Sequence, residues 1–503
     1  MDTYDLVLIG GGSAGLTGAR LAARLGARTL LAESGRLGGD CLWTGCVPSK
    51  ALLHAAAQVR AARDAGRYGM KPADGPADLG SVMAGVRRAI GVVEPHDSAR
   101  ELAAQGVEVE QGRARFTGPR TLEVAGREVG FRYALIATGS SPALPPVPGL
   151  TGGPSGGLSG GPSGDPSGGS VGDSGSGPLT NSGSEPLTSD TVWDLEELPG
   201  RLVVLGGGPV GCELGQAFAR LGSQVTIIEA AHRLLPREEE RASELLRDHL
   251  DKEGVTVLTA TPAKRIEDGA VHTATGREIT YDRLLAATGR VPRTTGLGLE
   301  MAGVRTGGKG HVTVDRSLRT ANPRVYAAGD VTPVSAFTHL AGVQAASAVQ
   351  HALLGTGQPV GYQTVPWVTF TDPEVARVGL TYEQARSRYG GRARERTLRH
   401  DRVDRAVTED RAEGFTRLVF GPRGRLAGAT VVAPRAGETI AELAAAVRVG
   451  ATASDLAATV HPYPTYGDGP WLAALAEVDR GLTEPGMRRL IGTLMTARRK
   501  IWR

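Results

Sequence analysis

Two segments of the chain repeat one pattern, in which an apolar strand, a glycine-rich turn, a helix and a second strand follow each other. They cover residues 6–33 and 202–229. The three glycines of the Gly-x-Gly-x-x-Gly pattern occur in both, as Gly10, Gly12, Gly15, Gly206, Gly208 and Gly211. The first glycine turns the chain, the second lets the backbone approach a pyrophosphate, and the third packs helix on strand. The repeat predicts two Rossmann-like α/β domains.

Each repeat ends in an acidic residue at a position suited to the ribose hydroxyls of a dinucleotide. Glu33 and Glu229 follow the third glycine of their own turn at the same offset. A single glycine turn is a weak signal, and two structural turns are the alternative interpretation. The shared context and offset favour two dinucleotide sites. Their other expected contact residues are Ser13, Ala14 and Val210.

Cys41 and Cys46 lie five positions apart in the run from Gly38 to Lys50, and two such cysteines can close a small disulfide. Five residues of regular helix rise about 7.5 Å, which strains the Cα separation of a disulfide. We therefore expect an irregular loop between the two cysteines. Gly39 and Gly45 give it the freedom to bend.

A helix is predicted directly after this loop, because Pro48 suits a first helical position and an Ala/Leu-rich run covers residues 51–62. Cys46 then lies near a helix N-terminus, where the dipole favours thiolate over thiol. This arrangement is typical of a redox cysteine. Cys212 stands alone, and we expect it to be a small buried apolar residue.

A disulfide near a dinucleotide needs an electron carrier between sulfur and a two-electron donor. Flavin can take hydride from a nicotinamide and pass electrons to sulfur. We expect FAD at one site and a nicotinamide nucleotide at the other. Glu229 favours NAD(H), because an acid repels the 2′-phosphate of NADP(H), while the nearby Arg233 favours NADP(H). NAD(H) is the preferred prediction.

Composition narrows the class of protein. A length of 503 residues allows three or four domains. Three cysteines are too few for a secreted disulfide framework, and we expect no metal site. No run approaches the roughly 20 apolar residues of a membrane span, and no signal peptide is evident, so we expect a cytoplasmic protein. The net charge of +4 does not indicate a nucleic-acid partner.

The chain resembles the pyridine nucleotide–disulfide oxidoreductases, which include dihydrolipoamide dehydrogenase, glutathione reductase and mercuric reductase. The resemblance rests on the cysteine run and on residues 133–140, 285–292, 325–330 and 370–379. It implies an α/β fold of two Rossmann-like domains plus a C-terminal α+β dimerisation domain. The implied parts are a split FAD-binding domain (1–150 and 286–362), an NAD(P)-binding domain (188–285) and a dimerisation domain (363–484).

The resemblance also implies roles for individual residues. Cys46 corresponds to the cysteine that contacts the flavin, and Cys41 corresponds to the interchange thiol that attacks the substrate. Lys50 corresponds to a lysine beside the flavin, and Glu213 corresponds to its ion-pair partner. The remaining implied contacts are Thr138, Gly139 and Asp330 for FAD and Gly289 for NAD(P).

Members of this family carry a His-Pro-Thr motif whose histidine acts as acid–base in the partner subunit's site. In this chain Tyr463 fills the histidine position and Asp468 fills the position of the following acid. Tyrosine, with a free pKa near 10, is a poor proton shuttle at pH 7. His461 would point to the same side as Tyr463 in an extended segment, and a structural hydrogen-bonding role is the favoured alternative. The resemblance implies a homodimer with shared active sites.

Two segments fall outside the family pattern. Residues 151–187 are rich in Gly, Ser and Pro and predict a flexible linker without chemistry. Residues 485–503 form a basic tail with apolar residues at helical spacing. A solvated basic tail is the favoured interpretation, and weak contact of an amphipathic helix with a membrane surface is the alternative.

These features predict an FAD-dependent NAD(P)H oxidoreductase that passes electrons through a Cys41–Cys46 disulfide to a disulfide-type or related small acceptor. Tyr463 resembles the mercuric reductases, but no cysteine follows Cys212 to capture a metal ion. A first alternative is therefore an NAD(P)H:quinone reductase that acts through flavin alone. A second is a non-catalytic redox sensor that holds FAD.

Overall fold

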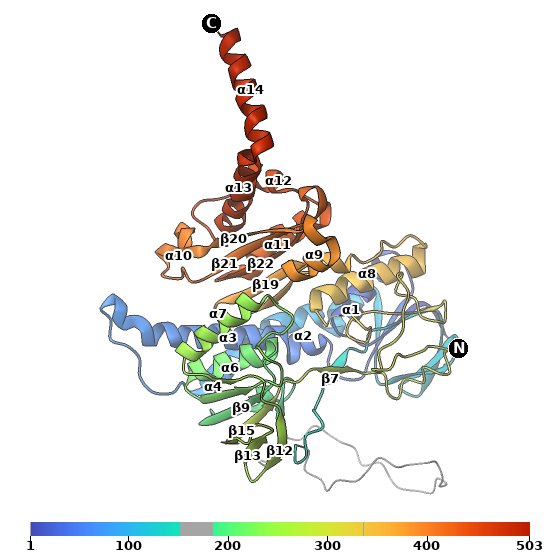
Figure 1. Ribbon diagram of the computed structural model, residues 1–503. Helices are drawn as coiled ribbons and strands as arrows, with labels where there is room; N and C mark the ends of the chain where they lie inside the picture. Colours follow the sequence, from blue (N-terminus) through green and yellow to red (C-terminus); the bar gives the residue numbers. More distant parts are fainter. Residues whose placement is uncertain (1, 151–184, 335, 503) are drawn as a thin grey trace.

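The computed structural model describes residues 2–150, 185–334 and 336–502, and Figure 1 shows its arrangement. A seven-stranded sheet, a five-stranded sheet and a second five-stranded sheet follow each other as the centres of three units. Most of the predicted linker, residues 151–184, lies outside the described residues.

The first unit is built on a largely parallel sheet in the order β3-β2-β1-β6-β5-β4, with β17 paired to β6. Its strands are β1 Thr3–Ile9, β2 Thr29–Glu33, β3 Val107–Gln111, β4 Ala114–Gly118, β5 Thr121–Val124, β6 Arg127–Ile136 and β17 Val325–Ala327. β1 is buried along most of its length, as expected for a parallel strand covered on both faces. Because β17 joins this sheet from far along the chain, the first unit is discontinuous in sequence.

The helices of the first unit cover this sheet and carry the cysteine run. They are α1 Ser13–Arg24, α2 Gly39–Trp43, α3 Cys46–Arg63, α4 Leu79–Val93, α5 Ala99–Ala104 and α8 Thr338–Leu354. α8 packs against α1, although more than 300 residues separate them in the chain. The helix predicted after the first glycine turn begins at Ser13, directly after Gly12.

The second unit repeats the plan with a parallel sheet in the order β11-β10-β9-β15-β8. Its strands are β8 Leu187–Thr188, β9 Arg201–Leu205, β10 Gln224–Ile228, β11 Thr256–Leu258 and β15 Arg283–Ala286, and its helices are α6 Pro209–Leu221 and α7 Glu240–Lys252. An antiparallel sheet of β12 Ala263–Glu267, β13 Ala270–Thr273 and β14 Glu278–Thr280 lies between β11 and β15 in the chain. β7 Ser140–Pro142 pairs with β16 Arg290–Pro292 at the two crossings between the units.

The third unit is an antiparallel sheet in the order β18-β19-β22-β21-β20 with helices packed on it. The strands are β18 Trp367–Thr369, β19 Glu374–Gly379, β20 Arg394–Arg399, β21 Phe415–Phe420 and β22 Leu426–Ala433. The helices are α9 Tyr382–Tyr389, α10 Asp404–Thr408, α11 Ala436–Val449, α12 Ala453–Ala458 and α13 Asp468–Thr483. α14, Pro485–Ile501, extends from this unit at the top of Figure 1.

The α/β fold with two Rossmann-like units and an α+β third unit is confirmed. The boundaries at residues 150, 188, 286, 363 and 485 stay a prediction. Among the described residues, no helix combines the length and apolar character that crossing a bilayer requires.

The cysteine helix α3 is held by the second unit as well as the first. Leu52 and Ala56 of α3 are fully buried in one apolar cluster with Leu214 and Phe218 of α6. A helix that begins at Cys46 therefore has a fixed direction relative to the nucleotide-type turn that precedes α6. The packing of α3 on α6 therefore joins the two units that contain the glycine turns.

Arg220, near the end of α6, joins the second unit to the third. It is buried, and its guanidinium donates to Glu253 at 2.8 Å and to Asp372 at 2.9 Å. Asp372 stands in the segment that leads into β19. The ion pair thus crosses the boundary between two sheets at a place with little access for water.

Replacing Arg220→Leu should lower the free energy of unfolding by about 3 kcal/mol, because it leaves Glu253 buried without its cation. Urea unfolding followed by circular dichroism measures the change. Arg241→Leu is the matched control, because Arg241 pairs with Glu244 at 3.1 Å on the exposed face of α7, where a pair contributes about 0.5 kcal/mol. An equal loss of unfolding free energy in the two variants would contradict the conclusion that Arg220 forms a stabilising buried ion pair.

Candidate active site

The two glycine turns have nearly identical geometry. Gly10 and Gly206 adopt φ values of +105° and +106°, which side chains rarely tolerate. A Cβ on Gly15 would lie 1.8 Å from the carbonyl oxygen of Gly10, and one on Gly211 would lie 1.9 Å from that of Gly206. Both helices therefore begin against their turns, with free N–H groups at an N-terminus suited to phosphate.

The two acids at the strand ends also match. Glu229 accepts backbone hydrogen bonds from Gly207 at 2.6 Å and from Ala231 at 2.7 Å. Glu33 accepts the equivalent bonds from Gly11 and Gly35. Each carboxylate is thus fixed beside its glycine turn, where the ribose of a dinucleotide would lie. The two other residues predicted for NAD(P) are Val210 of α6, which is half-exposed, and Gly289, which has φ +125°.

A cavity of about 1100 Å³ opens along the first glycine turn. The residues predicted for FAD that line it are Gly10, Gly12, Ser13, Ala14, Glu33, Thr138, Gly139 and Asp330. Ser140 donates to Asp330 at 2.7 Å, which fixes that carboxylate at the wall. A cavity of this volume, glycines where a Cβ would clash and an acid at the strand end suit an FAD molecule. The residues present therefore fit this cofactor.

Cys41 lies in the wall of the same cavity. The prediction of an irregular loop between the cysteines is wrong, because Cys41 belongs to the short helix α2 and Cys46 is the first residue of α3. Only Thr44 and Gly45 break the helical path, with φ values of −135° and −119°. This break ends the rise of a continuous helix, and the two thiols lie close enough to shift each other's pKa. Pro48 is the third residue of α3, where its missing N–H is still harmless.

The two thiols share their protons unequally. A hydrogen bond from Cys41 is the largest influence that lowers the pKa of Cys46 to about 6, helped by Thr338 and the Lys50 cation against burial. Thr338 Oγ1 lies 3.2 Å from Cys46 Sγ. The same hydrogen bond and burial raise the pKa of Cys41. At neutral pH the pair therefore holds one proton on Cys41 and a thiolate on Cys46.

Lys50 and Glu213 form the ion pair that the resemblance implied, with 2.8 Å between Nζ and Oε2. Glu213 is largely buried, and its second oxygen accepts the backbone N–H of Phe370 at 2.9 Å. The Lys50 ammonium also lies 4.2 Å from the centroid of the Phe370 ring. Lys50 is one turn from Cys46 along α3, so its charge is fixed near the thiolate.

A group of four charged residues beside Cys41 was not found from the sequence. Asp40 pairs with Arg290 and, at 3.2 Å, with Arg293, and Asp190 lies 3.4 Å and 3.6 Å from the same two arginines. Burial raises the pKa of Asp40 against the effect of the arginines. The position of Asp40 directly before Cys41 was the available signal, but its partners lie about 150 and 250 residues away.

The C-terminal candidates do not line the cavity that holds Cys41. Tyr463 is 72% exposed and donates to Asp404 at 2.5 Å. The imidazole of His461 lies 2.9 Å from Glu442 of α11. The expectation that His461 and Tyr463 share one side is therefore wrong, because their side chains contact different helices. Asp468 is buried at the start of α13 and accepts the N–H of Thr465 at 3.1 Å.

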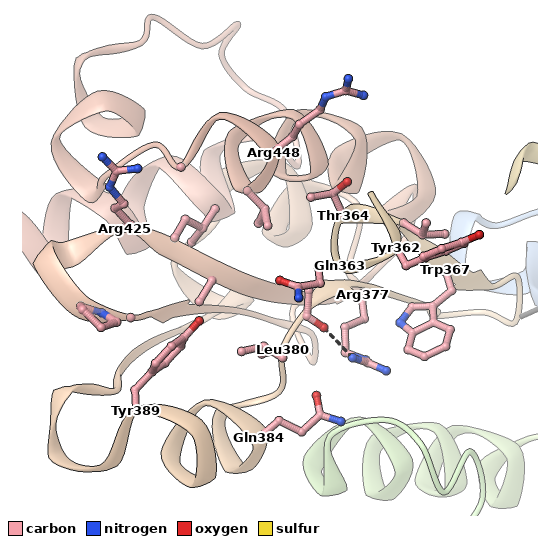
Figure 2. Close-up of a pocket in the computed structure, with 18 of the residues that line it drawn as sticks. Tyr362, Gln363, Thr364, Trp367, Arg377, Leu380, Gln384, Tyr389, Arg425 and Arg448 are labelled. Carbon is pink, nitrogen blue, oxygen red and sulfur yellow. Dashed lines mark hydrogen bonds between the residues drawn. The ribbon is translucent and has the colours of Figure 1, made fainter. Parts of the chain in front are cut away.

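A second cavity of about 810 Å³ lies between α9, α11 and the turn before β22 of the third unit, and the start of α8 also contributes to its lining (Figure 2). Trp367, Arg377 and Tyr389 are among its lining residues. Arg377 is buried there, donating to the carbonyl of Gly379 and pairing with Glu238 at 2.8 Å. No residue predicted for the site lines this cavity, so we place the chemistry at the cavity that holds Cys41. Cys212, as expected, is fully buried.

Two protein-family profiles match this chain and identify its family. The profile of the pyridine nucleotide-disulphide oxidoreductases matches residues 4–352, and that of their dimerisation domain matches residues 365–474. The chain belongs to this family. It is thus an FAD-dependent oxidoreductase that works with a pyridine nucleotide, and its dimerisation domain supports a homodimer.

Two curated relatives illustrate the range of the family. A dihydrolipoyl dehydrogenase of Thermus scotoductus is 39% identical over 95% of this chain and 98% of its own length. A mercuric reductase of Streptomyces lividans is 36% identical over 94% of this chain and 95% of its own length. Proteins of comparable similarity to this chain therefore include both a dihydrolipoyl dehydrogenase and a mercuric reductase.

Solved structures show the same architecture. The Cu(II) complex of RclA from Escherichia coli, an HOCl-induced flavoprotein disulfide reductase, is 27% identical with a TM-score of 0.79 and covers 95% of this chain and 100% of that one. LpdA from Mycobacterium tuberculosis is 27% identical with a TM-score of 0.80 and covers 95% and 99%. The three-unit arrangement is thus the one these relatives share.

Alkylation of the reduced protein should show a reactive Cys46 with a midpoint near pH 6, because the thiolate is the nucleophile. The Cys41→Ala change removes the largest influence that lowers this pKa, so the midpoint should rise by about one pH unit or more. Iodoacetamide labelling rates against pH, resolved by tandem mass spectrometry, measure both. Cys212→Ala is the control and should leave the midpoint unchanged, and an unmoved midpoint in Cys41→Ala would contradict the account.

Proposed function

We propose that this protein is an NAD(P)H-dependent disulfide reductase that passes reducing equivalents through Cys41 and Cys46 to a disulfide-type or related small acceptor. The observation that carries the proposal is that Cys41 lies in the wall of the dinucleotide-sized cavity and donates a hydrogen bond to Cys46, which carries the thiolate. A structural disulfide would not need one low-pKa partner beside a fixed cation. Bound FAD supplies the two-electron relay between nicotinamide and sulfur.

The thiol chemistry follows from the two pKa shifts. The protonated Cys41 gives its proton to the Cys46 thiolate along their hydrogen bond and attacks one sulfur of the acceptor. A Cys41–acceptor disulfide forms, and the acceptor's second sulfur leaves as a thiolate that takes up a proton. Cys46, returning its proton to solvent, then attacks the Cys41 sulfur and displaces the first acceptor sulfur as a thiolate, which also takes up a proton. The Cys41–Cys46 disulfide is restored, and one acceptor disulfide has become two thiols.

Lys50 and Glu213 have a positioning and electrostatic role in this proposal. The Lys50 ammonium favours negative charge at the start of α3, and Glu213 keeps the ammonium in place. Asp40, paired with both Arg290 and Arg293, fixes the short helix that carries Cys41. These contacts keep the two thiols in position while the acceptor disulfide is reduced.

We further propose that the partner subunit completes the site. In the family pattern the relevant residues are Tyr463 of the partner subunit and Asp468 of the partner subunit. The exposure of Tyr463 and its absence from the lining of its own chain's cavity support this arrangement. An isolated monomer would then be inactive toward disulfides. We propose the cytoplasm as its location.

We propose NAD(H) as the preferred nicotinamide nucleotide. Glu229 stands beside the second glycine turn, where its charge opposes a 2′-phosphate. Arg233, the residue that favours NADP(H) in the sequence, donates to the carbonyls of Pro236 and Glu238 at 3.4 and 3.3 Å. Its guanidinium is therefore directed toward the chain's own backbone.

A second candidate function is quinone reduction by the flavin without the thiols. Tyr463 in place of a histidine favours it, because a tyrosine hydroxyl bonded to Asp404 has a raised pKa and shuttles protons poorly at pH 7. A redox sensor that holds FAD without turnover is the remaining alternative, and measurable NADH oxidation excludes it.

Cys41→Ser separates the thiol route from the flavin route. We expect small-disulfide reduction to fall at least about 100-fold, since the attacking sulfur is lost, while NADH-dependent quinone reduction keeps its rate. Steady-state turnover of both acceptors by wild type and variant measures this. Cys212→Ala, which removes the buried third cysteine, should keep both activities. Unchanged disulfide reduction in Cys41→Ser would refute the proposed function.

The proposed role of Glu229 in favouring NADH can be tested by comparing the two nucleotides. We expect kcat/KM for NADH to exceed that for NADPH by about 10-fold or more, and Glu229→Gln to reduce the ratio about 10-fold by removing the charge. Glu33→Gln, the same change at the other glycine turn, is the control and should leave the ratio unchanged. A wild-type preference for NADPH would contradict the proposal.

A further inference from the structure

α14 carries an apolar stripe that the rest of the described chain does not bury. Along the helix from Pro485 to Ile501 the apolar residues recur every three or four positions, as Met487, Leu490, Ile491, Leu494, Met495 and Ile501, followed by Trp502. None of the helix's residues is buried. Leu494 is 58% exposed and Trp502 is 83% exposed. A stripe of this length is expected to have a partner surface.

The charge of the same segment has one sign. Its described cations are Arg488, Arg489, Arg498, Arg499 and Lys500, and the sequence contains no Asp or Glu from Pro485 to Arg503. At helical spacing Arg488 and Arg499 lie along one border of the stripe, and Arg489 and Lys500 lie on the opposite face. Thr493 and Thr496 donate back to carbonyls of their own helix. Arg498 falls within the stripe near its C-terminal end, and the polar face combines the other four cations with small and hydroxyl residues, so every charge on it is positive.

The position of α14 leaves it open to a large surface. Figure 1 shows the helix projecting away from the three sheets, with the end of the chain at its far tip. Glu484 ends α13 with ψ 139°, and Arg480 pairs with it at 2.7 Å, so the two helices are distinct. The dimerisation-domain match stops at residue 474, before α14 begins. The helix therefore lies outside the residues that the dimerisation-domain profile matches.

Its dimensions suit a position on a membrane rather than through it. Seventeen residues of helix span about 25 Å, and five cations interrupt any apolar run. An amphipathic helix with a basic face and Leu, Ile and Trp on the other lies in the headgroup region with its apolar side toward the acyl chains. Trp502, with the Arg498 guanidinium 5.9 Å above its ring, has an apolar body and a polar neighbour suited to that depth.

We propose that α14 docks this protein onto anionic membrane surfaces. The occupant of the stripe is a lipid bilayer whose acidic headgroups pair with the cations. This replaces the favoured expectation of a solvated tail, because a solvated tail would not require an ordered apolar stripe beside the charges. The inference is independent of the acceptor that Cys41 attacks. It concerns where the enzyme acts, and its failure would leave the proposed chemistry untouched.

Vesicle flotation of the full-length FAD-loaded protein tests the proposal. The protein should float with vesicles of phosphatidylcholine containing 30% phosphatidylglycerol and stay at the bottom with phosphatidylcholine alone. The partition coefficient should fall about fivefold for each cation removed in Arg488→Gln, Arg499→Gln and Lys500→Gln. A separate variant, Leu490→Ser with Leu494→Ser, should lose binding while keeping every charge.

A matched control removes three cations elsewhere. Arg392, Arg423 and Arg448 are exposed and line the second cavity of the third unit, outside α14, and their joint replacement by Gln should leave flotation unchanged. All variants should keep FAD content, NADH oxidation in solution and dimer mass by light scattering. Absence of flotation with acidic vesicles, equal loss in the control, or a loss of dimer in the Leu490→Ser/Leu494→Ser variant would overturn the proposal. The last outcome would assign the stripe to a second copy of the chain.

Discussion

The ion pair between Lys50 and Glu213 is the contact on which the arrangement around the cysteines depends. Lys50 stands on the helix that begins at Cys46, Glu213 stands on the helix after the second glycine turn, and Phe370 of the third unit binds both. One small cluster therefore joins all three units. Because Glu213 is largely buried, losing its cation would leave a charge in a poorly solvated place. The cluster thus links fold and chemistry.

The same cluster explains why the two thiols differ. Cys46 begins a helix, accepts a hydrogen bond from Cys41 and lies within reach of the Lys50 charge, so all three influences favour its thiolate. Cys41 is its hydrogen-bond donor and stays protonated. The asymmetry comes from position in the chain, since the break at Gly45 separates the end of α2 from the start of α3. The thiols therefore have distinct roles before any substrate arrives.

The sequence predicts the local parts of this protein well, because periodic apolar residues and fixed glycine spacings determine them. Both glycine turns, their acids and the buried Cys212 are placed as predicted. Contacts between distant segments were harder to predict. The salt bridges of Asp40 join residues separated by about 250 positions, which no spacing encodes. His461 and Tyr463 diverge because their partners, Glu442 and Asp404, lie on helices that only the third sheet brings near.

An anaerobic titration of the purified yellow protein with NADH tests the central claim, which is that the two thiols share reducing equivalents with the flavin. The account predicts that two electrons per flavin produce a long-wavelength absorbance band from the Cys46 thiolate against oxidised flavin, and that Cys46→Ser abolishes it. Bleaching of the flavin at two electrons without that band in the wild type would contradict the account.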